Sequence, residues 1–183
     1  MANTNHLPAP GTYAIDASHT HVGFAVKHFG LSKVKGEFEK FDGSLTVAED
    51  PTQSSVSVTI KTDSFNSRDD ARDVHVRSED FLHTVEHPEI TFRSTSVSGD
   101  GDDWTVVGDL TIKGVTRQIE LDVEFEGTIT DPFGFDRVAF SAETEIDRTE
   151  FGLTWNQVLE TGGMVVGKKV KIILEVEATK PSA

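Results

Sequence analysis

The sequence of 183 residues contains no cysteine, and this absence excludes several classes of protein at once. Disulfide-stapled folds, zinc–thiolate sites, iron–sulfur clusters and thiol nucleophiles all require cysteine. Tyrosine and tryptophan are also scarce, with one and two residues against twelve phenylalanines. Most aromatic side chains therefore bring no hydroxyl or N–H group that would need a buried hydrogen-bond partner.

Positive charge is in short supply as well. Lys and Arg number 17 against 31 Asp and Glu, so the formal net charge is −14 at pH 7. Nucleic acid is not expected as a partner, because phosphate binding needs clustered basic residues. The same excess of acid argues against a surface that docks on anionic lipid headgroups.

Long apolar runs are missing too. The longest, Val170 to Val176, is broken by charges and falls far short of the ~18 residues that span a bilayer. No basic segment followed by an apolar one opens the sequence, so we expect no transmembrane segment, no secretory leader and a cytoplasmic location. The length predicts one domain, at residues 11–178, with flexible tails at 1–10 and 179–183.

What the chain does contain is a regular alternation of apolar and polar residues. It is clearest from Ile119 to Phe125, where every second residue is apolar and the residues between are acidic, and it recurs in at least five other segments. A period of two predicts antiparallel strands with one buried face. Closure removes exposed sheet edges, so the expected fold is all-β, an antiparallel barrel of about eight strands with a short helical insertion, or else a sandwich.

Three places depart from the alternation. Residues 67–77 have no period of two and place Asp70 three residues after Ser67, which predicts a short helix with a capping box that runs on toward Phe81. Between Phe38 and Phe41 the apolar phase slips by one residue, which predicts a β-bulge. A second helical turn is expected around residues 149–151, in a segment that either covers the barrel mouth as a flap or packs into the core as a plug.

The apolar residues of the strands share one face and are expected to point into the barrel. With about eight strands, such side chains either fill the interior or leave room for one small ligand, and periodicity alone does not separate these cases. The residues in question are Val22, Phe24, Val26, Phe38, Val58, Ile60, Phe92, Leu110, Leu121, Val123, Phe125, Phe140 and Leu174.

Five segments in a specific order carry a family resemblance. The first reads IDASHTHVGFAVKH, and the set comprises Ile15–His28, Lys35–Gly43, Arg72–Leu82, His87–Phe92 and Gly108–Thr116. From about Gly11 to Ala178 the chain resembles the YceI-like proteins. The resemblance implies a lipocalin-like barrel whose elongated apolar pocket binds a long isoprenoid chain, on a polyprenyl lipid or a quinone. Family members are often dimers, so a homodimer is also implied.

Combined with this resemblance, the inward apolar residues become candidate ligand-binding residues. Phe151 and Trp155 join them from the segment after the last helical turn. His28 has the same parity as Phe24 and Val26, so it is expected to face inward at the strand end, where it either bonds a ligand head group or caps the rim. We therefore expect non-catalytic binding, storage or transport of an isoprenoid, with no further cofactor required.

Two other functions compete with this interpretation. The first is an enzyme acting on a lipid or isoprenoid with His28, His75 and nearby acids as acid–base groups, although no catalytic motif is present. The second is a filled barrel that serves as a stress or interaction module.

A metal site is a further alternative. His19 and His21 are expected to share a strand face, with a third ligand from Asp16, His75, His83 or His87. Nothing in the spacing requires a third ligand, so no metal is expected.

Overall fold

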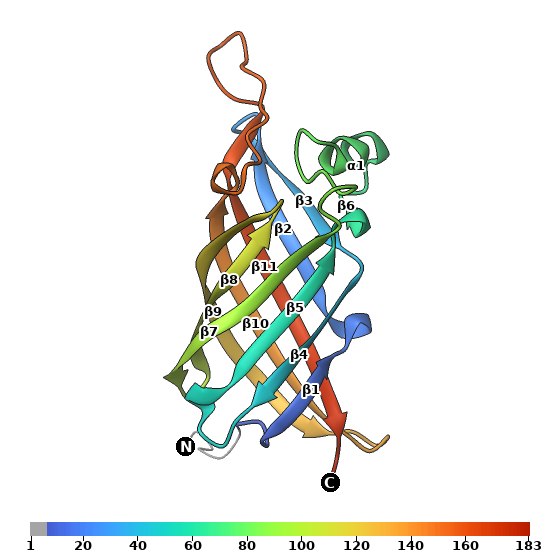
Figure 1. Ribbon diagram of the computed structural model, residues 1–183, viewed down its shortest axis with the longest axis vertical. Coiled ribbons are helices and arrows are strands. Elements are labelled where there is room, and N and C mark those ends of the chain that lie inside the picture. Colours follow the sequence, from blue (N-terminus) through green and yellow to red (C-terminus); the bar gives the residue numbers. More distant parts are fainter. Residues whose placement is uncertain (1–6) are drawn as a thin grey trace.

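The alternating segments form strands that pair with their sequence neighbours around a closed antiparallel barrel (Figure 1). The computed structural model describes residues 7–183. The strands are β1 (Gly11–Ile15), β2 (His21–His28), β3 (Ser32–Phe38), β4 (Phe41–Val47), β5 (Ser55–Lys61), β6 (Phe65–Asn66), β7 (Glu89–Asp100), β8 (Asp103–Ile112), β9 (Val115–Thr130), β10 (Phe135–Asp147) and β11 (Val166–Pro181). The helical elements are α1 (Asp70–Arg77) and the 3-10 turns η1 (Ala17–His19), η2 (Pro51–Gln53), η3 (Thr62–Ser64) and η4 (Arg148–Phe151).

The sheet has eleven strands but the barrel has eight walls, because each of three walls consists of two consecutive strands with a short interruption between them. β1 and β2 are two halves of one wall with η1 between them, and both pair with β11. β3 and β4 form the next wall, and β5 and β6 the one after, interrupted by η3. The pairing of Ile15 with Ala178 closes the ring. The expected eight-stranded barrel with a short helical insertion is confirmed.

The apolar phase slips between Phe38 and Phe41 because β3 ends at Phe38 and β4 starts at Phe41. The predicted bulge at this position is therefore wrong. Phe38 ends β3 opposite Val22 and Phe65, whereas Phe41 starts β4 opposite Ile60. The chain changes pairing partners there, and a two-residue connection shifts the side-chain phase just as a bulge would. Register shifts occur instead in other pairs, such as β9–β10 between Ala139 and Phe140.

The expected helix is present, with a different start. Asp69 caps α1 by accepting a hydrogen bond from the Arg72 amide at 2.9 Å. Ser67 lies before the helix and donates through its hydroxyl to Asp73 at 2.5 Å, so the predicted capping box is wrong. Asp69 is the residue whose carboxylate reaches the free amide of the first turn. Within residues 7–183, no helix is long and apolar enough to span a membrane.

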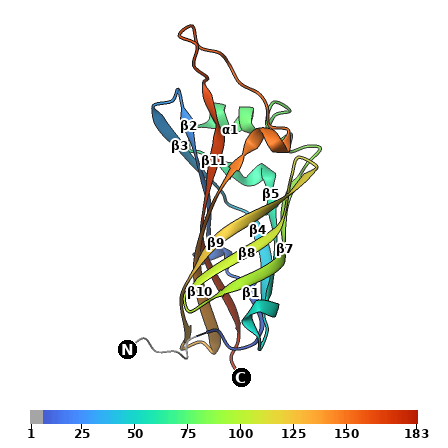
Figure 2. The same ribbon diagram turned by 90° about the vertical axis from the view of Figure 1, so that its left-hand side faces the viewer.

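The two ends of the barrel are built differently (Figures 1 and 2). We call one the helix end, which holds α1, η4, the β2–β3 and β8–β9 hairpins and residues 152–165. The other, the terminus end, holds η2 and the described ends of the chain. Residues 1–6 of the expected N-terminal tail lie outside the described residues. The expected tail at 179–183 is wrong in part, because β11 continues to Pro181, which pairs with Phe135.

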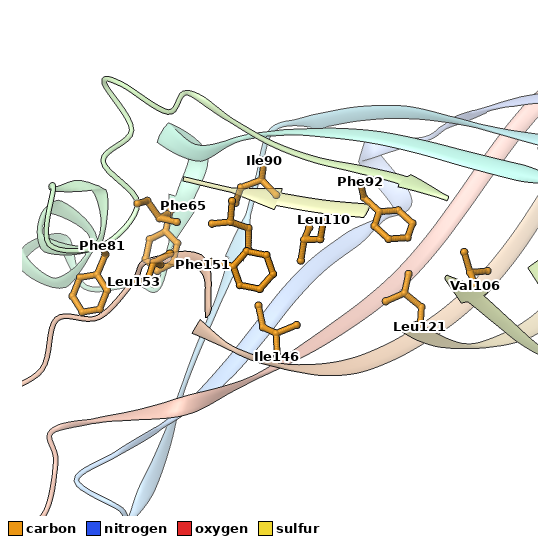
Figure 3. Close-up of a cluster of buried hydrophobic side chains, with 12 residues drawn as sticks. Phe65, Phe81, Ile90, Phe92, Val106, Leu110, Leu121, Ile146, Phe151 and Leu153 are labelled. Atoms are coloured by element: carbon orange, nitrogen blue, oxygen red, sulfur yellow. The ribbon is translucent and has the colours of Figure 1, made fainter. Parts of the chain in front are cut away.

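Buried apolar side chains gather in two clusters inside the wall. The larger runs from Phe81, beside α1, along the barrel to Val106 (Figure 3). The smaller lies toward the terminus end and contains Tyr13, Val47, Val138 and Ala178. Neither cluster fills the barrel, and the space that they leave is the candidate site.

Candidate functional site: an apolar cavity inside the barrel

A cavity of about 770 Å³ lies inside the barrel. Every second residue of β11 from Val170 to Ala178 faces it, and Val166 extends the series at the helix end. Lining residues also come from η2 at the terminus end and from α1 at the helix end, so the cavity runs along the barrel rather than across it. Strand alternation places these side chains, because residues two apart share a face.

The exposure of the inward side chains shows that the barrel is hollow. Ile172 and Leu174 point inward and yet are only half-buried, whereas Phe151 of the packed cluster is 1% exposed. A side chain that faces the interior keeps accessible surface only where no opposing wall touches it. The inward apolar residues therefore partly pack together and partly line an open space.

All sixteen candidate ligand-binding residues line this cavity. Their contact with a ligand stays a prediction. Sequence reasoning missed several other lining residues, among them Phe65, Ile90 and Ile172. Ile172 has the same parity as Leu174 and could have been found. Phe65 lies in a two-residue strand without alternation, so only the fold places it.

Phenylalanines form a continuous wall on one side of the cavity. The rings of Phe24 and Phe65 stack at 5.1 Å between centroids, and Phe38 meets Phe65 edge-on at 5.6 Å. These rings come from β2, β6 and β3, which are adjacent in the sheet. The wall is smooth and offers no hydrogen-bonding group to a ligand.

Charged lining groups gather at the helix end. The charged side chains among the lining residues are Asp69, Arg72 and Arg148, and all three belong to that end. His75 of α1 meets the Trp155 ring edge-on at 4.5 Å, and its Nε2 lies 2.9 Å from the Asp80 carboxylate. The cavity is thus mostly apolar, with its charged and imidazole groups at one end and the hydroxyl groups of Thr20, Ser54 and Ser55 elsewhere.

Arg148 is the most deeply buried of these charged groups, at 5% exposure. Its guanidinium donates to the carbonyl groups of Leu153 (2.6 Å), Trp155 (2.9 Å), Val166 (3.2 Å) and Gly167 (2.8 Å). Burial lowers the pKa of Arg148 from its ordinary value, because the charged form loses hydration. These bonds hold both limbs of residues 152–167 against the barrel.

The first part of the segment 149–155 packs into the core as a plug, and residues of the segment also line the cavity. Phe151 and Leu153 belong to the packed cluster, and η4 confirms the second helical turn expected there. Trp155 is only half-buried and lies against His75 and Phe81. The alternatives of plug and flap thus describe different residues of one segment.

His28 lines the cavity at the end of β2, as its parity predicts, and packs on Phe29. Its ring makes no hydrogen bond to an acidic side chain within residues 7–183. His75 lies on α1 with Asp80 as its partner. No contact joins the two histidines in this part of the chain, so the geometry does not favour the acid–base pair of the enzyme alternative.

The other histidines do not assemble as the metal alternative requires. His19 ends η1 rather than lying on a strand, and it bonds Asp16, while His21 pairs with Glu37 on β3. His83 and His87 approach each other and Glu86 instead. The predicted shared face of His19 and His21 is therefore wrong, because His19 belongs to a 3-10 turn and only His21 belongs to a strand.

An eight-stranded antiparallel barrel around an apolar cavity defines a lipocalin-like class of barrel. A sequence model of the YceI-like domain matches residues 13–178. Protein YceI of Escherichia coli O17:K52:H18 is 39% identical over 171 residues, which cover 92% of this chain and 86% of that protein. The chain belongs to the YceI-like family.

Solved structures share the fold. Burkholderia cenocepacia BcnA superposes with a TM-score of 0.78 at 22% identity, covering 89% of this chain and 98% of that one. A polyisoprenoid binding domain from Saccharophagus degradans gives a TM-score of 0.69 at 16% identity, covering 92% and 98%.

Proposed function

We propose that this protein binds an amphiphilic isoprenoid, a polyprenyl lipid or an isoprenoid quinone, inside the barrel and stores or carries it without catalysing a reaction. The observation that carries the proposal is the apolar lining along β11, continuous at every second residue from Val170 to Ala178. Membership of the YceI-like family and the likeness in fold to a polyisoprenoid binding domain support it.

The shape of the cavity favours an extended chain. Twelve residue steps along β11, from Val166 to Ala178, span roughly 40 Å at ~3.3 Å per residue, or roughly 30 Å along an axis from which strands tilt by about 40°. A cavity of about 770 Å³ spread over that length is elongated rather than compact. An elongated apolar space suits an extended aliphatic chain.

The polarity of the cavity orients the ligand. An isoprenoid tail gains roughly 25 cal/mol for each Å² of apolar surface that it buries against the wall, before the costs of association. The charged and imidazole side chains that could bond a polar head group lie at the helix end, among them Arg72, His28 and His75. The tail therefore points toward the terminus end.

Two neighbouring isoleucines on β11 give a matched test. Ile172 lines the cavity, whereas Ile173 points outward opposite Gly23 and Glu143. Mass spectrometry of an organic extract of the purified protein should show a prenyl species. Ile172→Trp should abolish its retention, because the indole blocks an elongated cavity, and Ile173→Trp should leave it unchanged.

Other outcomes decide against the proposal. Extracts free of prenyl species, together with a protein that geranylgeraniol does not stabilise against heat, would favour the filled-barrel module. Equal retention in both tryptophan variants would place the ligand elsewhere. A turnover lost in His28→Ala with binding intact would favour the enzyme.

We also propose that the protein is a homodimer in the cytoplasm. Light scattering of the purified protein tests the homodimer, and cell fractionation tests the cytoplasmic location.

A further inference from the structure

Exposed apolar side chains gather at the ends of the barrel. Within residues 7–183, every large apolar side chain that is exposed belongs to an element at one end. At the helix end, Leu31 is 87% and Val158 66% exposed, and Phe29 and Met164 are exposed beside them. We call these four residues the apolar tip.

The apolar tip is one continuous structure. The Phe29 amide donates to the Val165 carbonyl at 2.9 Å, which joins the β2–β3 hairpin to residues 152–165. Val158 and Met164 pair across the outer part of that segment. Figure 1 shows the segment projecting beyond the rest of the helix end. Side chains that protrude from two joined turns are suited to insertion rather than to packing against a flat surface.

Lysines surround the base of the tip, although the protein as a whole is acidic. Lys27 lies opposite Lys33 across β2 and β3, and Lys35 lies one step further along. Lys168 and Lys169 follow at the start of β11. Lys27, Lys33, Lys35 and Lys168 are exposed and form no ion pair within residues 7–183, so their charge is available to a partner.

Elsewhere near the ends, acidic residues outnumber basic ones among the exposed side chains. The α1 side of the helix end carries Asp70, Glu79 and Asp80, and Glu160 lies between Val158 and Met164 in the projecting segment. The terminus end has its own exposed apolar residues, Ile129 and Phe133, but its turns carry Asp50, Asp100 and Asp102. Within residues 7–183, the β2–β3 side is where exposed apolar side chains lie beside several lysines that form no ion pair.

The apolar tip lies beside the polar end of the cavity. His28, the last residue of β2, and Val165 and Val166, which follow the projecting segment, all line the cavity. A partner bound at the tip would therefore meet the end where the charged lining residues lie.

We propose that the apolar tip and the lysines at its base form a docking surface for an anionic lipid bilayer. The apolar side chains enter the interfacial region, and the lysines approach the negative headgroups. The net charge of −14 argued against such a surface, but charge acts over about a Debye length, so the local arrangement decides. The inference goes beyond the proposed function, because docking does not depend on which ligand the cavity holds.

Flotation with lipid vesicles tests the proposal directly. The full chain should float with vesicles of phosphatidylcholine that contain about one third phosphatidylglycerol, and not with phosphatidylcholine alone. Binding should weaken strongly when the salt is raised to about 0.5 M, because screening shortens the reach of the lysines.

Paired variants locate the surface. Lys33→Gln with Lys35→Gln should lower the vesicle partition coefficient roughly tenfold, whereas Lys40→Gln with Lys61→Gln, which changes the net charge equally, should leave it within about twofold. Leu31→Ser with Val158→Ser should lower it by a similar factor. The matched apolar control is Ile129→Ser with Phe133→Ser at the terminus end.

The outcomes separate this inference from the proposed function. None of the four substituted residues at the helix end lines the cavity, so prenyl retention should be unchanged in those variants, and Ile172→Trp should still float. No flotation with anionic vesicles at low salt overturns the docking surface, as does equal loss in the control variants. A dimer that Leu31→Ser converts to monomer, without vesicle binding, would make the tip an interface between two copies.

Discussion

The guanidinium carbon of Arg148 lies 5.8 Å from the centroid of the Phe81 ring. Arg148 follows directly on β10, and Phe81 follows α1, so one buried cation joins two segments that are far apart in the chain. The same group bonds the carbonyls of residues 152–167. The helix end is therefore held together by a side chain where strand pairing stops.

Replacing this cation should loosen the whole helix end. Arg148→Leu leaves buried carbonyls without donors, and we expect the free energy of unfolding to fall by about 3 kcal/mol. Urea unfolding followed by tryptophan fluorescence measures it. Arg117→Leu is the control, because Arg117 makes one exposed bond to the Glu150 carbonyl and its loss should cost less than about 1 kcal/mol. Equal stabilities of the two variants would contradict the assigned role.

A second network, of half-buried groups around the buried Asp131, ties the terminus end together and should respond to acid. Arg137 bonds Asp131 at 2.6 Å, Glu177 at 2.6 Å and Asp16 at 3.2 Å. Burial alone would raise the pKa of Asp131, but bonds from Arg137 and from the amides of Phe135 and Phe133 outweigh it and lower the pKa. The Ser18 hydroxyl, then His19, lower the pKa of Asp16.

A carboxyl group with a lowered pKa in the folded state stabilises the fold above its unfolded pKa of about 3.9 and loses that effect as the pH falls further. Asp131→Asn should therefore lower the urea midpoint at pH 7, and the difference from the natural protein should shrink below about pH 4. Asp122→Asn, on the exposed wall, should show little difference at either pH. If the difference in urea midpoint between Asp131→Asn and the natural protein stayed the same at low pH, the charge of Asp131 would not be the source of its stabilising effect.

The hollow interior predicts unequal costs for the same truncation. Both Ile90 and Ile172 line the cavity, but Ile90 is 4% exposed within the packed cluster, whereas Ile172 is half-buried. Ile90→Ala should destabilise by about 2–5 kcal/mol, and Ile172→Ala by about 1 kcal/mol, because the second side chain has fewer neighbours to lose. Chemical denaturation measures both. Equal costs would indicate that the walls close on each other around Ile172.

The barrel and its inward face could be predicted because a period of two specifies which side chains share a face. Leu121, Val123 and Leu174 were placed in this way. Errors arose where the chain leaves that period: the corner at Phe38 to Phe41 mimicked a bulge, and the turn at His19 broke an expected strand. Phe65 was missed because a two-residue strand shows no periodicity.

The sequence by itself determined the strands, their buried face and the family, since these depend on local alternation and on the order of motifs. Only the tertiary structure decided that the barrel is hollow, because parity says which way a side chain points and not whether the opposite wall reaches it. It alone placed Arg148 over Phe81 and gathered unpaired lysines on one edge of an acidic protein. Arg148 and Phe81 are far apart in the sequence, and so are Lys168 and the lysines of the β2–β3 hairpin. Folding brings each set together.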